Sequence, residues 1–246
     1  MEQCIKRGNI RDLKRAIRLS GDINPNSLRN KSDGRSLLMV AAQSNKTRTM
    51  EYLLARSSIL DVTAQQFNGF TALHYAAWKG SVGASRLLLE AGADPARYDT
   101  YGIAPLHKAV AFNQRQILEA MLFNNEFDLA NLPTGEVSCP DDYEAISLID
   151  TPLHIAARSG NVTIMKLLVA HGARAGRVNR NGDMPLHCAV RQGKVRAVDF
   201  LLKEHARLNI LPHSLTRKNK NGILPGDTCP RFDATCLSVW IKVRIA

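Results

Sequence analysis

The chain has 246 residues, of which 45% are apolar, and its 33 Lys and Arg outnumber its 22 Asp and Glu to give a formal net charge of +11. This apolar content is ordinary for a folded protein, and no apolar run reaches the roughly 18 residues of a membrane-spanning helix. The first residues lack the apolar core of a signal peptide, and the five scattered cysteines are an odd number that does not suit a disulfide framework. We therefore expect a cytoplasmic or nuclear protein without a membrane span.

The first elements are two short helices. Apolar residues at Ile10, Leu13, Ala16 and Ile17 have the spacing of one helix face, and a turn at Gly8 separates them from an earlier helix. The opposite face is basic, which suits the solvated surface of a terminal repeat.

A second helix pair is predicted within residues 32–61, with Asn45 at its central turn. Asparagine adopts the left-handed backbone of such a turn at modest cost. Met39 stands where the later pairs have a histidine and does not offer the same polar contacts. This pair is therefore expected to be looser than the next two.

The clearest helix pair lies within residues 69–94. Leu73, Ala76 and Ala77 line one face of a first helix, and Leu87 and Leu88 belong to the apolar face of a second. Two helices this short bury too little surface to be stable alone, so copies should flank them.

Copies are present, because the Leu-His pair at 73–74 recurs at 106–107, 153–154 and 186–187. With the motif TPLHxAA, complete from Thr151 to Ala157, and GAD at 92–94, the chain resembles the ankyrin-repeat family over about residues 4–210. The resemblance implies an all-α ankyrin-repeat solenoid of about six helix-turn-helix units with β-hairpin fingers. The expected units span about 1–31, 32–65, 66–98, 99–145, 149–178 and 179–210.

An acidic insert at 125–148 lengthens the fourth unit. Residues 116–157 contain eight carboxylates and no Lys or Arg, whereas residues 158–220 have a net charge of +10. Two interpretations stay open: a longer hairpin, with Phe127, Leu129 and Val137 around a turn at 133–135, or a disordered acidic loop. An insert folded across the basic part of the chain would act as a built-in inhibitor.

The repeat pattern decays beyond Asn209, so residues 211–246 are predicted to form a degenerate seventh unit and a C-terminal tail. Gly226, Asp227 and Pro230 should disrupt the first helix of that unit. Apolar residues alternate from Leu237 onward with the period of a strand. This end could be a capping strand, a partner-binding tail or an unrelated segment.

A periodic row of histidines does not predict a metal site. Stacked repeats hold equivalent residues about 10 Å apart, by analogy with packed layers, whereas zinc needs ligand atoms about 2 Å from one ion. The resemblance implies instead that each histidine ties its helix to the neighbouring turn. No triad, nucleophile elbow or Gly-rich phosphate loop is recognisable, so we expect no enzyme, cofactor or metal here. The four histidines are His74, His107, His154 and His187.

The resemblance implies that partners are gripped by the finger tips and by the exposed face of the first helices. Aromatic and arginine side chains at such positions often dominate binding energy. An equally open alternative is that Phe67 and Phe112 pack between repeats. Carried onto this sequence, the candidate partner-binding residues are Arg35, Phe67, Phe70, Trp78, Lys79, Tyr101, Phe112, Arg158, Arg180, Arg191 and Gln192.

The favoured function is a non-enzymatic, monomeric scaffold or adaptor that binds a protein or peptide on its concave face. Trp78 and Tyr101 would anchor apolar groups, and Arg158, Arg180 and Arg191 would pair with an acidic ligand. Nucleic-acid binding is the rival from another class, but stacking aromatics and a groove-reading motif are missing from the basic part. The chain could also be the regulatory ankyrin subunit of a larger enzyme complex.

Overall fold

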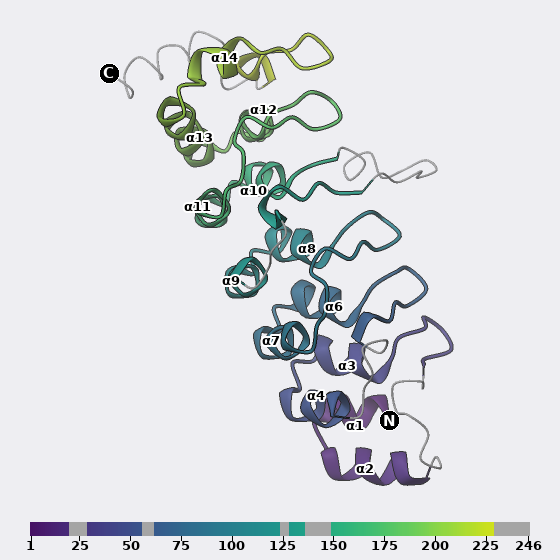
Figure 1. Ribbon diagram of the computed structural model, residues 1–246. Coiled ribbons are helices and arrows are strands. Elements are labelled where there is room, and N and C mark those ends of the chain that lie inside the picture. Colours follow the sequence, from purple (N-terminus) through teal and green to yellow (C-terminus); the bar gives the residue numbers. More distant parts are fainter. Residues whose placement is uncertain (20–28, 56–61, 124–127, 136–148, 229–246) are drawn as a thin grey trace. The chain divides into compact units, whose positions relative to one another are not determined.

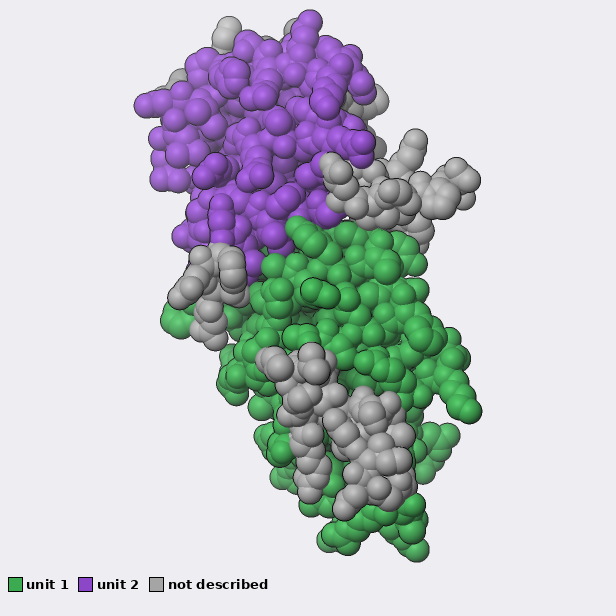
Figure 2. All heavy atoms as spheres, turned by 45° about the vertical axis from the view of Figure 1, so that its right-hand side comes forward, with its two compact units in different colours: residues 1–124 green, residues 125–246 purple. Residues whose placement is uncertain are grey.

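The computed structural model describes residues 1–19, 29–55, 62–123, 128–135 and 149–228 (Figure 1). The chain divides into two compact units, residues 1–124 and 125–246, which are coloured separately in Figure 2. The regular elements of the described residues are all helices, which confirms the all-α prediction.

The helices that the structure describes in unit 1 form four pairs. The first helices of the second, third and fourth pairs stack in one layer, and their second helices stack in another (Figure 1). Leu73, Ala76, Ala77 and Leu88 are buried between them, as their spacing predicted. The pairs are α1 (Glu2–Arg7) with α2 (Ile10–Leu19), α3 (Leu37–Gln43) with α4 (Thr47–Leu54), α6 (Ala72–Lys79) with α7 (Val82–Glu90), and α8 (Pro105–Ala111) with α9 (Arg115–Phe123).

Unit 2 has the same construction. Its helices are the 3-10 helix η1 (Leu129–Asn131), then α10 (Pro152–Ser159) with α11 (Val162–Ala170), α12 (Pro185–Arg191) with α13 (Val195–Arg207), α14 (Leu211–Thr216) and the 3-10 helix η2 (Pro225–Thr228). Helix α10 packs on α12, and α11 packs on α13. The sequence pattern did not predict α14. The single turn η2 packs on α12 where a seventh first helix would stand, and Gly226 and Asp227 lie within it.

The first helices α6 and α10 are tied to the fingers by their histidines. In α6 the Nδ1 atom of His74 accepts a hydrogen bond of 3.0 Å from the Thr71 N–H, so Nε2–H donates to the Ile103 carbonyl at 3.0 Å. His154 makes the equivalent bonds, with its Nε2 at 2.9 Å from the Asp183 carbonyl. These contacts confirm the expected role for His74 and His154. Because the ring of His74 is buried, its pKa is lowered to about 3, and the side chain is neutral.

The turn between the helices of a pair uses glycine or asparagine with positive φ. Asn45 has φ 49°, and its Oδ1 accepts a hydrogen bond of 3.1 Å from the Ala84 N–H in the first turn of α7. The asparagine therefore links the second pair to the third. Met39 is buried, and its sulfur lies 3.5 Å from the Ser36 N–H. The looser packing expected of this pair stays a prediction.

The fingers are tight loops. Their described residues contain an isolated antiparallel bridge between Arg29 and Ser36, and they contain no extended β-strand. In the finger before α8, the Asp99 N–H donates to the Ile103 carbonyl at 3.0 Å, and Asp99 Oδ1 accepts 2.9 Å hydrogen bonds from the N–H groups of Tyr101 and Ile103. This side chain fixes the finger from within, as in an Asx turn.

The finger before α10 contains the acidic insert. The Thr134 N–H donates to the Asp150 carbonyl at 2.9 Å, as the Asp99 N–H does to the Ile103 carbonyl in the finger before α8, so Thr134 pairs across the finger with Asp150 and is not in its tip. The turn predicted at 133–135 is therefore wrong. Leu129 is buried in η1 rather than in a hairpin strand, because Asn131 fixes this turn by bonding to Gly172 and Arg174. The predictions for Phe127, Val137, most of the insert and the strand-like end fall outside the described residues.

Candidate functional site

An aromatic patch on unit 1 joins two neighbouring repeats. It consists of Phe70, Tyr75, Trp78 and Phe112. The ring centroid of Trp78 lies 6.3 Å from that of Phe112 and 6.4 Å from that of Tyr75, and Tyr75 lies 5.6 Å from Phe70. Trp78 is 37% and Phe112 50% exposed, whereas Tyr75 is 8% exposed. A buried tyrosine thus contacts the exposed Trp78 ring, and Trp78 in turn contacts the exposed Phe112 ring of the next repeat.

The ends of two first helices position these rings. Trp78 is in the last turn of α6, and Phe112 is the C-cap of α8. The helices are followed by Gly80 and Asn113, whose φ values are 74° and 57°. The left-handed turn reverses the chain directly after each ring, so the rings stay on the finger side and second helices pack behind them.

Two lysines lie on the aromatic patch. Lys79 Nζ is 4.0 Å from the Trp78 ring centroid, and Lys108 Nζ is 4.2 Å from that of Phe70. The Lys108 side chain is 14% exposed and lies 3.2 Å from the Asp99 carboxylate. Burial lowers the pKa of Lys108, and Asp99 opposes this shift. Because the chain's own ammonium groups lie on these ring faces, a cationic ligand is disfavoured there.

Three other candidates of unit 1 lie on its fingers. Phe67 is 68% exposed, yet its ring covers the neighbouring finger, since a Cβ on Gly34 would lie 2.8 Å from it. Arg35 pairs with Asp33 within its own finger. Tyr101 is half-buried, and the structure holds its backbone through Asp99. Phe67 thus packs on a neighbouring repeat, as the alternative expected, and its role in partner binding stays a prediction.

In unit 2 the positions equivalent to Phe70 and Trp78 hold an ion pair. Asp150 directly precedes the N-cap of α10, and Arg158 follows it eight residues later and pairs with its carboxylate. The carboxylate is buried, and its other oxygen accepts a hydrogen bond of 2.8 Å from Asn179 Nδ2. Arg158 is therefore occupied within the chain.

The next repeat has the same arrangement. Arg191 Nη2 donates to Asp183 Oδ2 at 2.7 Å, and Asn219 Nδ2 donates to Asp183 Oδ1 at 2.8 Å. Asp183 is fully buried. Arg180 and Gln192 are exposed near this group, and Arg180 has no ion pair among the described residues. Of the three arginines expected to meet an acidic ligand, two thus already have a carboxylate partner.

The structure brings together Trp78, Lys79 and Phe112, with Phe70 beside them, and it places Arg158, Arg180 and Arg191 in the other unit. Sequence reasoning did not single out the residues that support the aromatic patch or those that neutralise the arginines. The sequence does contain a signal for the ion pairs, because Asp150 and Arg158 are eight residues apart, and so are Asp183 and Arg191. The residues missed in this way are Tyr75, Asp99, Lys108, Asn179 and Asn219.

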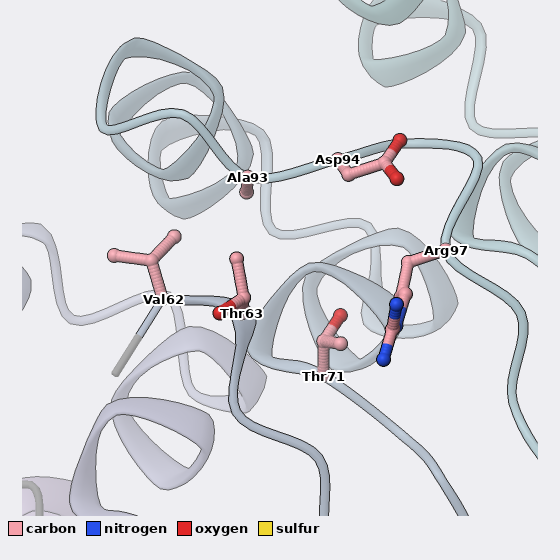
Figure 3. A pocket seen from close by; sticks show the side chains of 6 residues that line it. All are labelled: Val62, Thr63, Thr71, Ala93, Asp94 and Arg97. Atoms are coloured by element: carbon pink, nitrogen blue, oxygen red, sulfur yellow. The ribbon is translucent and has the colours of Figure 1, made fainter. Parts of the chain in front are cut away.

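A pocket of about 250 Å³ lies between the start of α6 and the segments at 62–63 and 93–97 (Figure 3). Its polar side chains are used within the chain. The Thr71 hydroxyl contacts His74, Arg97 Nη2 donates to Gln65 Oε1 at 3.3 Å, and the Asp94 carboxylate accepts from the Ala96 N–H at 2.7 Å. The pocket therefore offers little unused polar recognition. Its lining residues are Val62, Thr63, Thr71, Ala93, Asp94 and Arg97.

The described ranges contain no group of three His, Cys, Asp or Glu side chains arranged to hold a metal ion. Over the same ranges, none of the helices has the length and apolarity needed to cross a membrane.

Comparisons with known proteins agree with this architecture. The putative palmitoyltransferase ZDHHC13 of Danio rerio is 30% identical over 168 residues, covering 60% of this chain and 26% of that protein. The human transient receptor potential cation channel subfamily A member 1 is 29% identical over 163 residues, covering 66% of this chain and 14% of that protein. The chain therefore spans about a quarter or less of these two curated relatives.

The solved structure of the human ASB11 ankyrin repeat domain has a TM-score of 0.75 and 25% identity to this chain, and the match covers 98% of this chain and 96% of that one. Ankyrin repeat domains are generally protein–protein interaction modules. A family model described as ankyrin repeats in three copies matches residues 1–99 and 106–211. With most of its length matched in this way, the chain belongs to the ankyrin-repeat family.

Proposed function

We propose that this chain is a protein-interaction module whose aromatic patch takes an apolar side chain of a partner protein or peptide. The supporting observation is the pair of exposed rings, Trp78 and Phe112, which contact each other while Trp78 also contacts the buried Tyr75. Exposed tryptophan on a packed support is typical of residues that dominate binding energy. Because Tyr75 and the helix ends hold the rings in place, little conformational freedom is lost when a partner binds.

The lysines define the chemistry of the proposed partner. Lys79 is exposed beside Trp78, and Lys108 lies beside Phe70. A carboxylate next to the apolar anchor would meet these ammonium groups, whereas a cationic side chain would be repelled. The partner segment is thus apolar with acidic flanks, and the role is that of a scaffold or adaptor without a catalytic step.

Peptide selection tests this proposal without a known partner. The folded chain is used to select binders from a random peptide library displayed on phage, and the selected peptides are measured against Trp78→Ala and Phe112→Ala. Losing a central aromatic anchor costs about 2 kcal/mol, so each variant should bind roughly tenfold or more weakly. Phe123→Ala is the matched control, because Phe123 is 84% exposed at the end of α9 and lies outside the aromatic patch.

The outcome is decided by comparing these variants. Folding of each is checked by circular dichroism and by its urea midpoint. Peptides that bind Trp78→Ala and Phe112→Ala as tightly as the unchanged chain would disprove the role of the aromatic patch. Selected peptides without an apolar residue would do the same.

A further inference from the structure

We propose that the fingers of unit 2 form a second docking surface, which binds an acidic polypeptide segment. This second surface is separate from the aromatic patch, because it consists of different residues in the other unit. We call it the basic finger surface and define it as Arg177, Arg180, Lys218 and Lys220. All four side chains are exposed.

The two fingers that carry these residues touch backbone to backbone. The Lys220 N–H donates a hydrogen bond of 2.9 Å to the Asn181 carbonyl of the preceding finger. Gly182, with φ 75°, permits this approach, since a Cβ there would lie 3.0 Å from the Lys220 nitrogen. Arg180 and Lys220 hold the same position in their fingers, directly after Asn179 and Asn219. Their cationic side chains therefore start from adjoining backbones.

The basic finger surface also rests on a fixed base. The Oδ1 atom of Asn179 accepts hydrogen bonds of 3.0 Å from the N–H groups of Asn181 and Asp183, and Asn219 makes the same bonds in the next finger. The Asn219 amide also donates to the buried Asp183 carboxylate. Two fingers tied in this way need little ordering when a ligand binds.

Among the described residues, no neighbouring carboxylate neutralises the charge of the basic finger surface. Residues 158–220 contain three carboxylates, and each already has a basic partner. In the part of the chain that the structure describes, none of the four cations of the surface lies within 4.0 Å of a carboxylate. The three pairs are Asp183 with Arg191, Asp199 with Lys203, and Glu204 with Arg207.

An acidic polypeptide fits this surface better than a nucleic acid. Phe200 is the one Phe, Tyr or Trp among the described residues of unit 2, and it lies on α13 rather than on a finger. The surface thus has no ring on which a base could stack. Carboxylates match both the planar fork of Arg180 and the point charge of Lys220. In an extended acidic segment, alternate side chains recur about every 7 Å on one side and can meet several of these cations in turn.

Fluorescence anisotropy of the full chain tests the proposal with a labelled peptide of alternating Glu and Ser. Binding should weaken steeply as salt is raised, since exposed charges are screened. Arg180→Glu with Lys220→Glu should weaken it about tenfold or more, and Arg180→Gln with Lys220→Gln should weaken it less. The matched control is Lys166→Glu with Arg196→Glu, which makes the same change in net charge at exposed residues of α11 and α13. This control should retain most of the affinity.

Three outcomes would overturn the proposal. They are no binding at low salt, an equal loss in the finger and control variants, and tighter binding of a single-stranded oligonucleotide with the same dependence on Arg180 and Lys220. Trp78→Ala serves to separate the two proposals. It should leave the anisotropy titration unchanged, so failure of the aromatic patch and failure of the basic finger surface are distinguishable.

Discussion

Arg191 donates a 2.7 Å hydrogen bond to the buried carboxylate of Asp183, and these residues hold the positions that Trp78 and Phe70 hold in unit 1. The same two places therefore serve different purposes within one chain. In the α6 repeat of unit 1 they carry two aromatic rings, of which Trp78 is exposed. In unit 2 they lock a finger to its helix, which leaves the finger tips as the exposed charged part.

Arg191→Ala should lower the free energy of unfolding by about 2 kcal/mol, because it leaves the Asp183 carboxylate buried with only the Asn219 amide to meet it. The loss stays below that of a fully buried pair, since the arginine side chain is 38% exposed. Urea unfolding measures it. Arg180→Ala is the control and should stay within about 0.5 kcal/mol of the unchanged chain.

A second substitution sharpens this test. Adding Asp183→Asn to Arg191→Ala removes the unpaired charge and should restore part of the lost stability. An unchanged urea midpoint in Arg191→Ala would show that the ion pair adds nothing to the fold.

The helix pairs could be predicted because their apolar residues repeat at helical spacing and because the turn residues recur with them. Asn45 was identified as a turn residue for the same reason, and its φ is positive. Helix α14 was missed since it lies between repeats, where no period applies. Leu129 was misplaced because its position depends on Asn131, which bonds across the unit to Gly172.

The candidate site was predicted only in part. Periodicity correctly places Trp78 and Phe112 at the ends of first helices, but it does not reveal what lies beneath or beside them. Whether an arginine is available depends on a partner eight residues away and on an asparagine from the next finger, as Asp183 and Asn219 are for Arg191. Such contacts arise only when repeats stack, so they are not visible within one copy of the motif.

Stability should fall as the solution is acidified below about pH 6.5. The pKa of His74 is about 3 in the folded chain and 6.5 when it is unperturbed, and burial also lowers the pKa of His154. Between these two values the unfolded chain binds protons that the folded chain excludes. Each such histidine therefore lowers the free energy of unfolding by up to about 1.4 kcal/mol per pH unit, whereas above pH 6.5 its contribution is constant.

Urea unfolding at about pH 5 and pH 7.5 tests this dependence. His74→Gln should narrow the stability difference between the two pH values. His171→Gln should leave that difference intact, because His171 is exposed. A pH difference that is the same in all three proteins would exclude His74 as a source.

Gly69→Ala should destabilise unit 1 more than Gly193→Ala destabilises unit 2. Both glycines have positive φ, 77° and 63°, so alanine is strained at either position by about 1 kcal/mol. A Cβ on Gly69 would also lie 2.7 Å from the Thr100 backbone nitrogen, whereas Gly193 has no atom within 4 Å of the added carbon. Backbone cannot rotate away as a side chain can, so a further 1–3 kcal/mol is expected from overpacking. Equal losses of stability in urea would contradict this contact between fingers.

Ser85→Ala should raise the stability of unit 1. Ser85 lies in α7 with no exposed surface, and its hydroxyl has no hydrogen-bond partner among the described residues. The equivalent residues of other repeats are apolar, as Met50 and Leu118 are. Removing a buried, unpaired hydroxyl from a helix, where alanine is also the better helix former, should add about 1 kcal/mol to the free energy of unfolding. Ser81→Ala is the control, since Ser81 is also buried but precedes α7. A lower urea midpoint in Ser85→Ala would mean that the hydroxyl has a partner in solution, because only the loss of a real hydrogen bond offsets both gains.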